Sequence, residues 1–222
     1  MNRTLVGLLA LVALLIATPL MAQQRRGGRG GAFGQVTKAT LLGNENVQKE
    51  LEIVADQKDQ IAKIVEEARQ GRRGGRGQDL SDEEREKARK ERADRAAAID
   101  KKIDAVLVGP QKTRLNEIYV QALGTMAFSN PEIAKELGVG EDLQEKIATA
   151  RREAMQAAFQ DGGGGGPEAF AKARTESEKA VMALLSADQK AKFEKMKGKP
   201  VSFDLSAIGR GGRGRRGGGG NN

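Results

Sequence analysis

From Asn44 onward, apolar residues recur at intervals of three and four along most of the chain. This spacing places them on one face of an α-helix, and no convincing run of alternating β-branched residues interrupts it. The pattern therefore predicts an all-α fold. The predicted apolar faces, in chain order, are Val47, Leu51, Val54, Ile61, Ile64, Val65 and Ala68; Ala96, Ile99, Ile103, Val106 and Leu107; Leu115, Ile118, Tyr119 and Ala122; Leu143, Ile147, Ala150, Ala154 and Ala158; and Phe170, Ala173, Ala180, Val181, Leu184 and Leu185, followed by Phe193 and Met196.

Helix-start signals agree with this periodicity. Ser81 with Glu84 and Ser186 with Gln189 have the spacing of a capping box, in which each side chain satisfies a free amide of the first turn. Residues 81–95 are almost wholly polar, and their acids precede bases by four positions, a spacing that stabilises an exposed helix. We expect this segment to be a solvated charged helix or an arm that faces a partner.

The helical region contains an internal duplication. Residues 49–51 (Lys-Glu-Leu) recur at 135–137, an offset of 86, and residues 107–112 align with 185–190, an offset of 78. The difference of eight residues falls in glycine-rich linkers, where a duplicated helical unit tolerates insertion. The sequence thus predicts two tandem helical-hairpin repeats, each with long helices and a short third helix. A thin hairpin cannot bury its own apolar stripe, so we expect the repeats to pack on each other or on a second chain.

Positive charge is concentrated in three Arg/Gly segments, at residues 25–31, 71–77 and 209–220. Their arginines are Arg25, Arg26, Arg29, Arg72, Arg73, Arg76, Arg210, Arg213, Arg215 and Arg216. Removing these ten and Arg3 from the 38 basic residues leaves 27 against 30 acidic ones, so the rest of the chain carries −3 rather than the overall +8. Such segments bury too little apolar surface to offset their ordering entropy, which predicts disordered termini and loops.

The first 22 residues have the three-part form of a secretory signal peptide. A basic start precedes an apolar run of 13 residues at 5–17, and the small Ala22 before Gln23 marks the predicted cleavage site. An uncleaved anchor is the alternative, but about 20 apolar residues are needed to span a bilayer. We therefore expect a periplasmic or secreted protein. The predicted organisation is a signal peptide (1–22), a disordered Arg/Gly-rich tail (23–43), helical repeat 1 (44–124, flexible loop 71–78), helical repeat 2 (125–208, glycine loop 161–166) and a second disordered tail (209–222).

Each predicted repeat begins and ends with a degenerate LTxxQ-type motif. The clearest copy is residues 185–189 (Leu-Ser-Ala-Asp-Gln), and looser copies lie at 53–57, 107–111 and 139–143. In such a motif an apolar residue docks the preceding chain, a hydroxyl caps the next helix and the glutamine reaches back toward the cap. The candidate motif residues are Gln57, Gln111, Ser186 and Gln189. The copy at 139–143 has lost its glutamine, and only Ser186 supplies the hydroxyl.

These motifs resemble those of the bacterial periplasmic Spy/CpxP-like (LTxxQ) proteins, including their tandem, glycine-rich relatives. The resemblance covers roughly residues 44–200. It implies an α-helical, often dimeric cradle whose members are ATP-independent chaperones, envelope-stress regulators or metal-resistance accessories. The metal-binding branch relies on histidine, which this chain lacks, so that activity is not carried over.

The absent residue types exclude several kinds of chemistry. The chain has no Cys, His or Trp, which excludes disulfides, cysteine or histidine relays and zinc sites built on those ligands. Acidic residues at 82–86 fit the first turn of a helix better than a cation site. No nucleophile–base pair is evident, so the prediction is a non-enzyme with no catalytic residues, metal or cofactor.

Two functions remain open. The first is an extracytoplasmic chaperone or envelope-stress accessory that holds unfolded protein on amphipathic faces bearing Met126, Met155, Met182 and Met196. Methionine on such a face is equally an ordinary core residue. The alternative is a structural or adhesive envelope protein whose Arg/Gly segments bind polysaccharide, lipid head groups or extracellular DNA. A further interpretation is that the Arg/Gly segments are only solubilising linkers. Few aromatic residues lie near them, which argues against specific nucleic-acid binding.

Residues 201–205 are predicted to form a short apolar tail that packs back on the helices.

Overall fold

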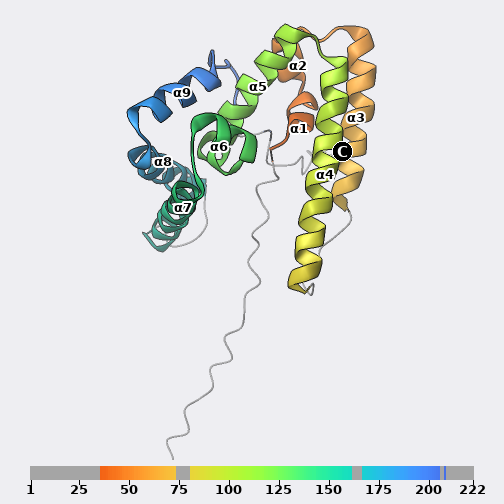
Figure 1. Ribbon diagram of the computed structural model, residues 1–222. Helices are drawn as coiled ribbons and strands as arrows, with labels where there is room; N and C mark the ends of the chain where they lie inside the picture. Colours follow the sequence, from red (N-terminus) through yellow and green to blue (C-terminus); the bar gives the residue numbers. More distant parts are fainter. Residues whose placement is uncertain (1–35, 74–80, 162–166, 206–207, 209–222) are drawn as a thin grey trace, which may run out of the picture. The chain divides into compact units, whose positions relative to one another are not determined.

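The computed structural model describes residues 36–73, 81–161, 167–205 and 208, and in this part of the chain every regular element is helical and strands are absent. The predicted all-α class is confirmed. Figure 1 labels the elements, which are α1 (Lys38–Leu42), α2 (Glu45–Glu50), α3 (Ala55–Arg73), α4 (Asp82–Val106), α5 (Gly109–Leu123), the 3-10 helix η1 (Gly124–Ser129), α6 (Pro131–Leu137), α7 (Glu141–Asp161), α8 (Pro167–Leu184) and α9 (Ala187–Lys197). Within the described ranges no helix is long and apolar enough to cross a membrane.

The predicted boundaries of the disordered segments need three corrections. Helix α1 lies inside the segment 23–43 that was predicted to be disordered, and its Ala39, Leu41 and Leu42 are fully buried. A reciprocal cap between the Thr37 and Thr40 side chains and backbones starts this short helix. Helix α3 continues to Arg73, inside the predicted loop 71–78, and α7 includes Asp161, the first residue of the predicted loop 161–166.

Two pairs of long helices form the frame: α3 packs along α4, and α7 along α8 (Figure 1). The α3–α4 seam is made of large side chains, among them Ile61, Ile64 and Ile103, and a Lys102–Glu67 ion pair at 2.6 Å closes its exposed side. The α7–α8 pair is rich in small side chains: it buries Ala158, Ala173 and Ser177 in addition to the larger Ile147 and Val181. Small side chains let helix axes approach closely, and α7 and α8 are in more extensive contact than α3 and α4.

The buried side chains form two clusters that follow the two halves of the chain, except that Val120 of the first half belongs to the second cluster. We call residues 36–123 the first half and residues 124–208 the second half. The first cluster comprises Ala39, Leu41, Leu42, Val47, Leu51, Ile53, Ile61, Ile64, Val65, Ile99, Ile103, Leu107, Leu115 and Ile118. The second comprises Val120, Ala127, Phe128, Ile133, Ala134, Leu137, Val139, Ile147, Val181, Leu185 and Phe193. Tyr119 on α5 packs against both.

A short helical segment completes the apolar seam of each long pair. In the first half α1 contacts α3, α4 and α5, and in the second half η1 contacts α7, α8 and α5. Phe128 of η1 is fully buried, and its ring centroid lies 4.7 Å from that of Phe193 on α9. These segments provide the third layer of side chains that two helices alone lack.

The short helices α2 and α6 end in the same way. At the end of α2 the Ile53 amide donates to the Gln48 carbonyl at 2.9 Å, and at the end of α6 the Val139 amide donates to the Ala134 carbonyl at 2.8 Å. Each is a Schellman stop, which requires a left-handed residue just after the helix. That residue is Glu52 in the first case (φ 51°) and Gly138 in the second (φ 66°).

Exchanging the residue types at these two stops should change stability in opposite directions. A left-handed backbone costs a non-glycine residue roughly 1–2 kcal/mol, while glycine costs about 0.4–1 kcal/mol through the unfolded chain. We expect Glu52→Gly to raise the free energy of unfolding by about 0.5–1 kcal/mol and Gly138→Glu to lower it by a similar amount. Urea denaturation followed by circular dichroism measures both.

Gly109→Ala serves as the control, because Gly109 has an ordinary φ and a Cβ at this position would meet no other atom within 4 Å. It should be neutral or stabilising. A destabilised Glu52→Gly protein would contradict the interpretation that the left-handed turn at residue 52 is strained.

Candidate binding surfaces

The glutamines of the first two motifs meet across the base of the first long hairpin. Gln57, in the first turn of α3, donates from Nε2 to Oε1 of Gln111 at 2.8 Å, and Gln111, in the first turn of α5, donates back to Oε1 of Gln57 at 3.0 Å. We call this reciprocal pair the glutamine clasp. It joins two helix starts that lie 54 residues apart in sequence.

Every hydrogen-bonding position of the clasp is used. Gln57 also donates to the Val106 carbonyl at 2.9 Å and accepts from the Val54 amide at 3.2 Å. Gln111 donates to the Leu51 carbonyl at 3.1 Å and accepts from the Val108 amide at 3.1 Å. A primary amide has two donor hydrogens and two acceptor lone pairs, so both side chains are saturated. The clasp thus caps α3 and α5 and ties the end of α2 to the end of α4.

The second half contains one glutamine that is placed like a member of the clasp, Gln189, but no partner glutamine. Ser186 and Gln189 form a capping box at the start of α9, with the Gln189 amide donating to the Ser186 hydroxyl at 3.2 Å and the Ser186 amide donating to Oε1 of Gln189 at 3.0 Å. Nε2 of Gln189 reaches across to the Gly138 carbonyl at 3.0 Å. At an offset of 86 from Gln57 stands Leu143, which packs against the second core cluster. A glutamine pair therefore cannot form there.

Two valines are exposed beside the clasp. Val54 was predicted to lie on the apolar face of a helix, but it precedes the first residue of α3 and is 60 % exposed; Val108, the N-cap of α5, is 57 % exposed. At such a position a hydroxyl or carboxamide side chain is worth roughly 0.5–2 kcal/mol over an apolar one. From the third residue of each helix the clasp supplies only the reciprocal half of a capping box, because its oxygens accept from the backbone amides of Val54 and Val108 themselves.

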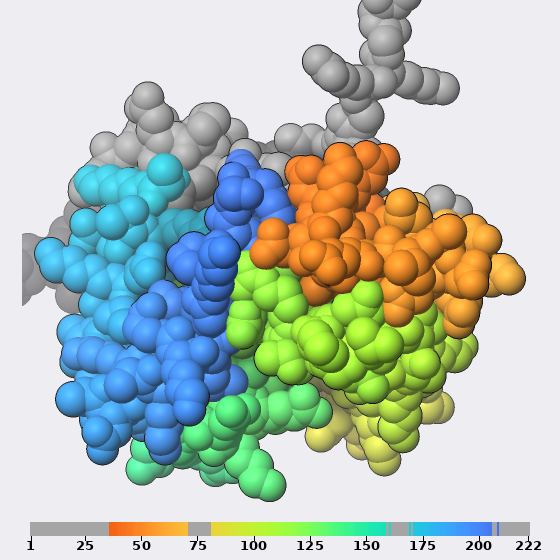
Figure 2. Space-filling model, turned by 90° about the horizontal axis from the view of Figure 1, so that it is seen from above, coloured from red at the N-terminus to blue at the C-terminus, as the bar shows by residue number. Residues whose placement is uncertain are grey.

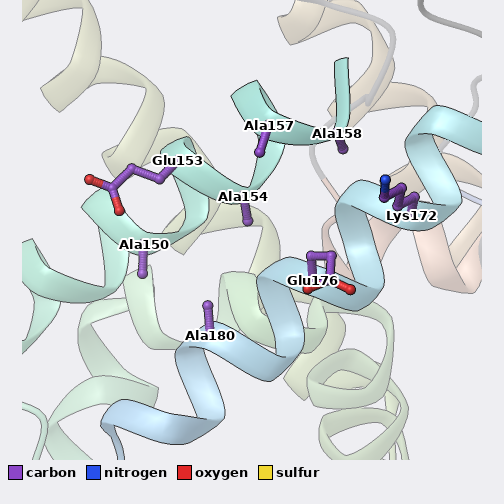
Figure 3. A pocket seen from close by; sticks show the side chains of 8 residues that line it. All are labelled: Ala150, Glu153, Ala154, Ala157, Ala158, Lys172, Glu176 and Ala180. Carbon is purple, nitrogen blue, oxygen red and sulfur yellow. The ribbon is translucent and has the colours of Figure 1, made fainter. Parts of the chain in front are cut away.

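An open groove runs along the α7–α8 pair. Figure 3 shows Ala150, Ala154, Ala157 and Ala158 of α7 projecting toward α8. Charged side chains border this alanine floor: Glu153 on α7, and Lys172 and Glu176 on α8. The groove has a volume of about 490 Å³. A second hollow shares Ala150 and Glu153 with it and is bordered by Leu184, which is 38 % exposed. The two hollows form a continuous shallow surface with an apolar floor and a charged border.

The four methionines predicted on helix faces divide between surface and core. Met126 and Met155 are exposed, and Met126 lies against the Arg151 guanidinium. Met182 and Met196 are half-buried and pack against the second core cluster. The core interpretation is confirmed for Met182 and Met196, and Met126 and Met155 are accessible at the surface.

Most of the candidate polyanion and processing residues lie outside the described part of the chain. These are Ala22 and Gln23, the predicted cleavage site, and Arg25, Arg26, Arg29, Arg76, Arg210, Arg213, Arg215 and Arg216. Arg72 and Arg73 belong to the last turn of α3. Within the described ranges no group of three or more acidic side chains is placed to hold a metal ion.

A half-buried polar seam joins the two core clusters. Burial raises the pKa of the Asp100 carboxyl on α4; nearby Lys38 opposes the shift, and the negative charges of Asp104 and Glu132 reinforce it. Burial likewise raises the pKa of the Tyr119 hydroxyl, which hydrogen-bonds to the Asn130 side chain. The ionised form of Asp100 is therefore disfavoured by folding.

The clasp should behave as one cooperative unit. We expect Gln57→Leu or Gln111→Leu to lower the free energy of unfolding by about 1–3 kcal/mol, because each leaves backbone groups and the other amide without partners. The double variant should cost less than the sum of the two, since the lost pair is then counted once. Chemical denaturation of the three variants forms the double-mutant cycle.

Gln60→Leu is the matched control on the exposed side of α3 and should change stability by less than about 0.5 kcal/mol. Strict additivity of the two clasp substitutions would show that the amides act independently.

Ionisation of Asp100 should lower the stability of the folded protein at neutral pH, and this cost should be absent at acid pH. Because the folded-state pKa is raised, folding binds protons between the unfolded and folded values, and stability falls as pH rises through that window. Asp100→Asn should therefore raise the denaturation midpoint at pH 7, and the gain should disappear below the ordinary aspartate pKa of 3.8. A midpoint difference that is constant from pH 3 to pH 8 would contradict this. Asp59→Asn, on the exposed surface of α3, is the control.

Comparison of the chain with family models, with curated proteins and with solved structures finds no match in any of the three.

Proposed function

We propose that this chain is an extracytoplasmic helical binding protein that acts as an ATP-independent chaperone or envelope-stress accessory and holds unfolded polypeptide. The observation that carries the proposal is the open α7–α8 groove, in which an apolar floor of alanines lies between charged borders. A shallow surface of this kind offers contact to apolar segments without demanding one side-chain shape. The signal-peptide pattern of residues 1–22 supports a periplasmic or secreted location.

We further propose that the two halves are tandem copies of one helical unit. Asn44 and Asn130 both cap a short helix with their side chains, and Glu52 and Gly138 both form its left-handed stop, each pair at an offset of 86. The order of short helix, long pair and closing helix is also common to both halves. These agreements support the resemblance to tandem Spy/CpxP-like proteins.

Nothing in this proposal requires catalysis. The groove is bordered by Glu153, Lys172 and Glu176, and each is exposed to solvent. The partners that fit the groove are unfolded or partially folded proteins, with a second copy of the chain as a further partner.

The test is suppression of client aggregation by residues 23–222. Light scattering of chemically reduced insulin should fall when the protein is added in several-fold molar excess. Ala157→Arg places a long cation on the groove floor at an exposed position and should weaken suppression several-fold. Ala148→Arg, also exposed on α7 but outside the groove, should leave it unchanged.

Three outcomes contradict the proposal: no suppression by the native protein, equal loss in the two arginine variants, or suppression that collapses between about 50 and 200 mM salt. The last would instead favour polyanion-type binding by the Arg/Gly segments, since counterion release makes such binding strongly salt-dependent.

A further inference from the structure

Residues 199–205 and Ile208, which follow α9, cross from the second half back onto the first. We call them the C-terminal strap. Val201, Phe203, Leu205 and Ile208 pack against the first core cluster, although α9 itself belongs with the second. Figure 2 shows this blue end of the described chain beside the orange α1–α2 segment. The strap is therefore a piece of one half that is bound by the other.

Helix α5 grips the strap by its main chain. Gln121 donates from Nε2 to the Lys197 carbonyl at 2.5 Å and to the Lys199 carbonyl at 2.9 Å, and its Oε1 accepts from the Val201 amide at 3.2 Å. Arg114 donates to the same Lys199 carbonyl at 2.6 Å. All of these contacts are to backbone atoms. Any residue at position 201 can therefore make them except proline, which lacks the N–H group.

Arg114 is held in place by residues of the first half, independently of its contact with the strap. Its guanidinium pairs with Glu50 of α2 at 2.7 Å and with Glu117 one turn along α5 at 2.6 Å, and its side chain is only 16 % exposed. Gly198 lets the strap approach, because a Cβ there would collide with the Glu117 carboxylate. The groove side of the contact is thus preorganised by residues of the first half.

The strap presents its side chains alternately. Val201, Phe203 and Leu205 are half-buried, whereas Ser202 and Asp204 are exposed. Backbone hydrogen bonds combined with apolar contacts at every second residue are the general way in which proteins bind an extended peptide. These strap side chains are only half-buried, whereas most residues of the first core cluster beneath them are nearly inaccessible to solvent. The strap is the outermost and least buried layer, which is the layer that opens at the lowest free-energy cost.

We propose that the strap occupies a peptide-binding groove on the first half, and that this groove accepts an extended segment of another polypeptide with apolar residues at alternate positions when the strap leaves. Arg114 and Gln121 hold the main chain of either occupant, and the surface of the first core cluster takes its apolar side chains. The groove is separate from the α7–α8 surface. The inference therefore stands or falls independently of chaperone activity.

The test uses a fluorescein-labelled decapeptide with the sequence of residues 199–208, Lys-Pro-Val-Ser-Phe-Asp-Leu-Ser-Ala-Ile, and measures its fluorescence anisotropy with the full chain. A tethered strap competes at an effective concentration in the millimolar range, so the native chain should bind the peptide weakly. The strap variant Val201→Ser/Phe203→Ser should bind it at least about tenfold more tightly. A second peptide with Ile, Leu and Val at the same alternate positions and different residues between them should bind comparably. A peptide with serine at positions 201, 203, 205 and 208 should not bind.

Groove-side substitutions separate the proposed site from nonspecific adhesion. Gln121→Ala, added to the strap variant, should lower peptide affinity by about tenfold, because it removes the partner of two backbone groups of the peptide, the Lys199 carbonyl and the Val201 amide. Asn116→Ala, exposed on the same helix, should have no effect. Equal peptide affinity in the native chain and the strap variant, or no effect of Gln121→Ala, would overturn the proposal. A strap variant that exchanges its strap into a stable dimer without binding the peptide would overturn it too.

Hydrogen exchange on the native chain covers the case in which the strap variant fails to fold. Saturating peptide should increase exchange at the Val201 amide and leave the amides of α3 protected, whereas unchanged exchange at Val201 would refute displacement. Client aggregation distinguishes this inference from the proposed function. If peptide binding rises on strap release but no variant suppresses aggregation, the groove stands and the chaperone proposal fails; if suppression is normal but peptide binding never changes, the reverse holds.

Discussion

Two antiparallel helices share only one apolar seam, and everything else in this fold follows from the need to cover it. The seam of α3 and α4 is covered by α1, and the seam of α7 and α8 is contacted by η1. Both covering segments are too short to be stable alone, so they depend on tertiary burial, as the complete burial of Leu41, Leu42 and Phe128 shows. Because η1 directly follows α5, covering the second pair also fixes where the first half ends. The strap, leaving α9 through Gly198, adds a further layer to the first cluster.

Periodicity and capping patterns predicted most of the helices, since both depend on residues close in sequence. The face predicted for one helix from Val47 to Ala68 is divided between α2 and α3, which residues 51–54 separate. The boxes at Ser81 and Ser186 form as their spacing indicates. Helix α1 was missed because five residues beside an Arg/Gly tail carry too little periodicity, and its burial depends on distant helices. The clasp was missed in part for the same reason. Each glutamine was predicted to reach back to its own cap. Their mutual pairing joins residues 54 positions apart, so it depends on the tertiary structure and not on the local sequence.

The clasp also explains why valine is tolerated at two helix starts. Without a hydroxyl at position 54 or 108, the starts of α3 and α5 keep only the reciprocal half of a capping box, in which the glutamine oxygens accept from the Val54 and Val108 amides. The second half uses the opposite solution at α9, where Ser186 supplies the cap and Leu143 replaces the other glutamine. A polar network that is fully satisfied is a stable alternative to apolar packing, whereas a half-satisfied one is not. In the second half Gln189 bonds to the Gly138 carbonyl instead of to a second glutamine, so no reciprocal pair is left half-satisfied there.

The two halves differ most in what covers their surfaces. The seam of α7 and α8 leaves a shallow groove open along its length, because small side chains bring the axes together without filling the space beside them. The first half, with larger side chains in its seam, has its remaining apolar surface covered by the half-buried residues of the strap. A non-helical segment that bends at Ser202 and Phe203 and is held through its backbone by Arg114 and Gln121 is replaceable in a way that a packed helix is not. The same chain thus combines one surface that is open in the structure with one that is covered by a segment of the chain itself.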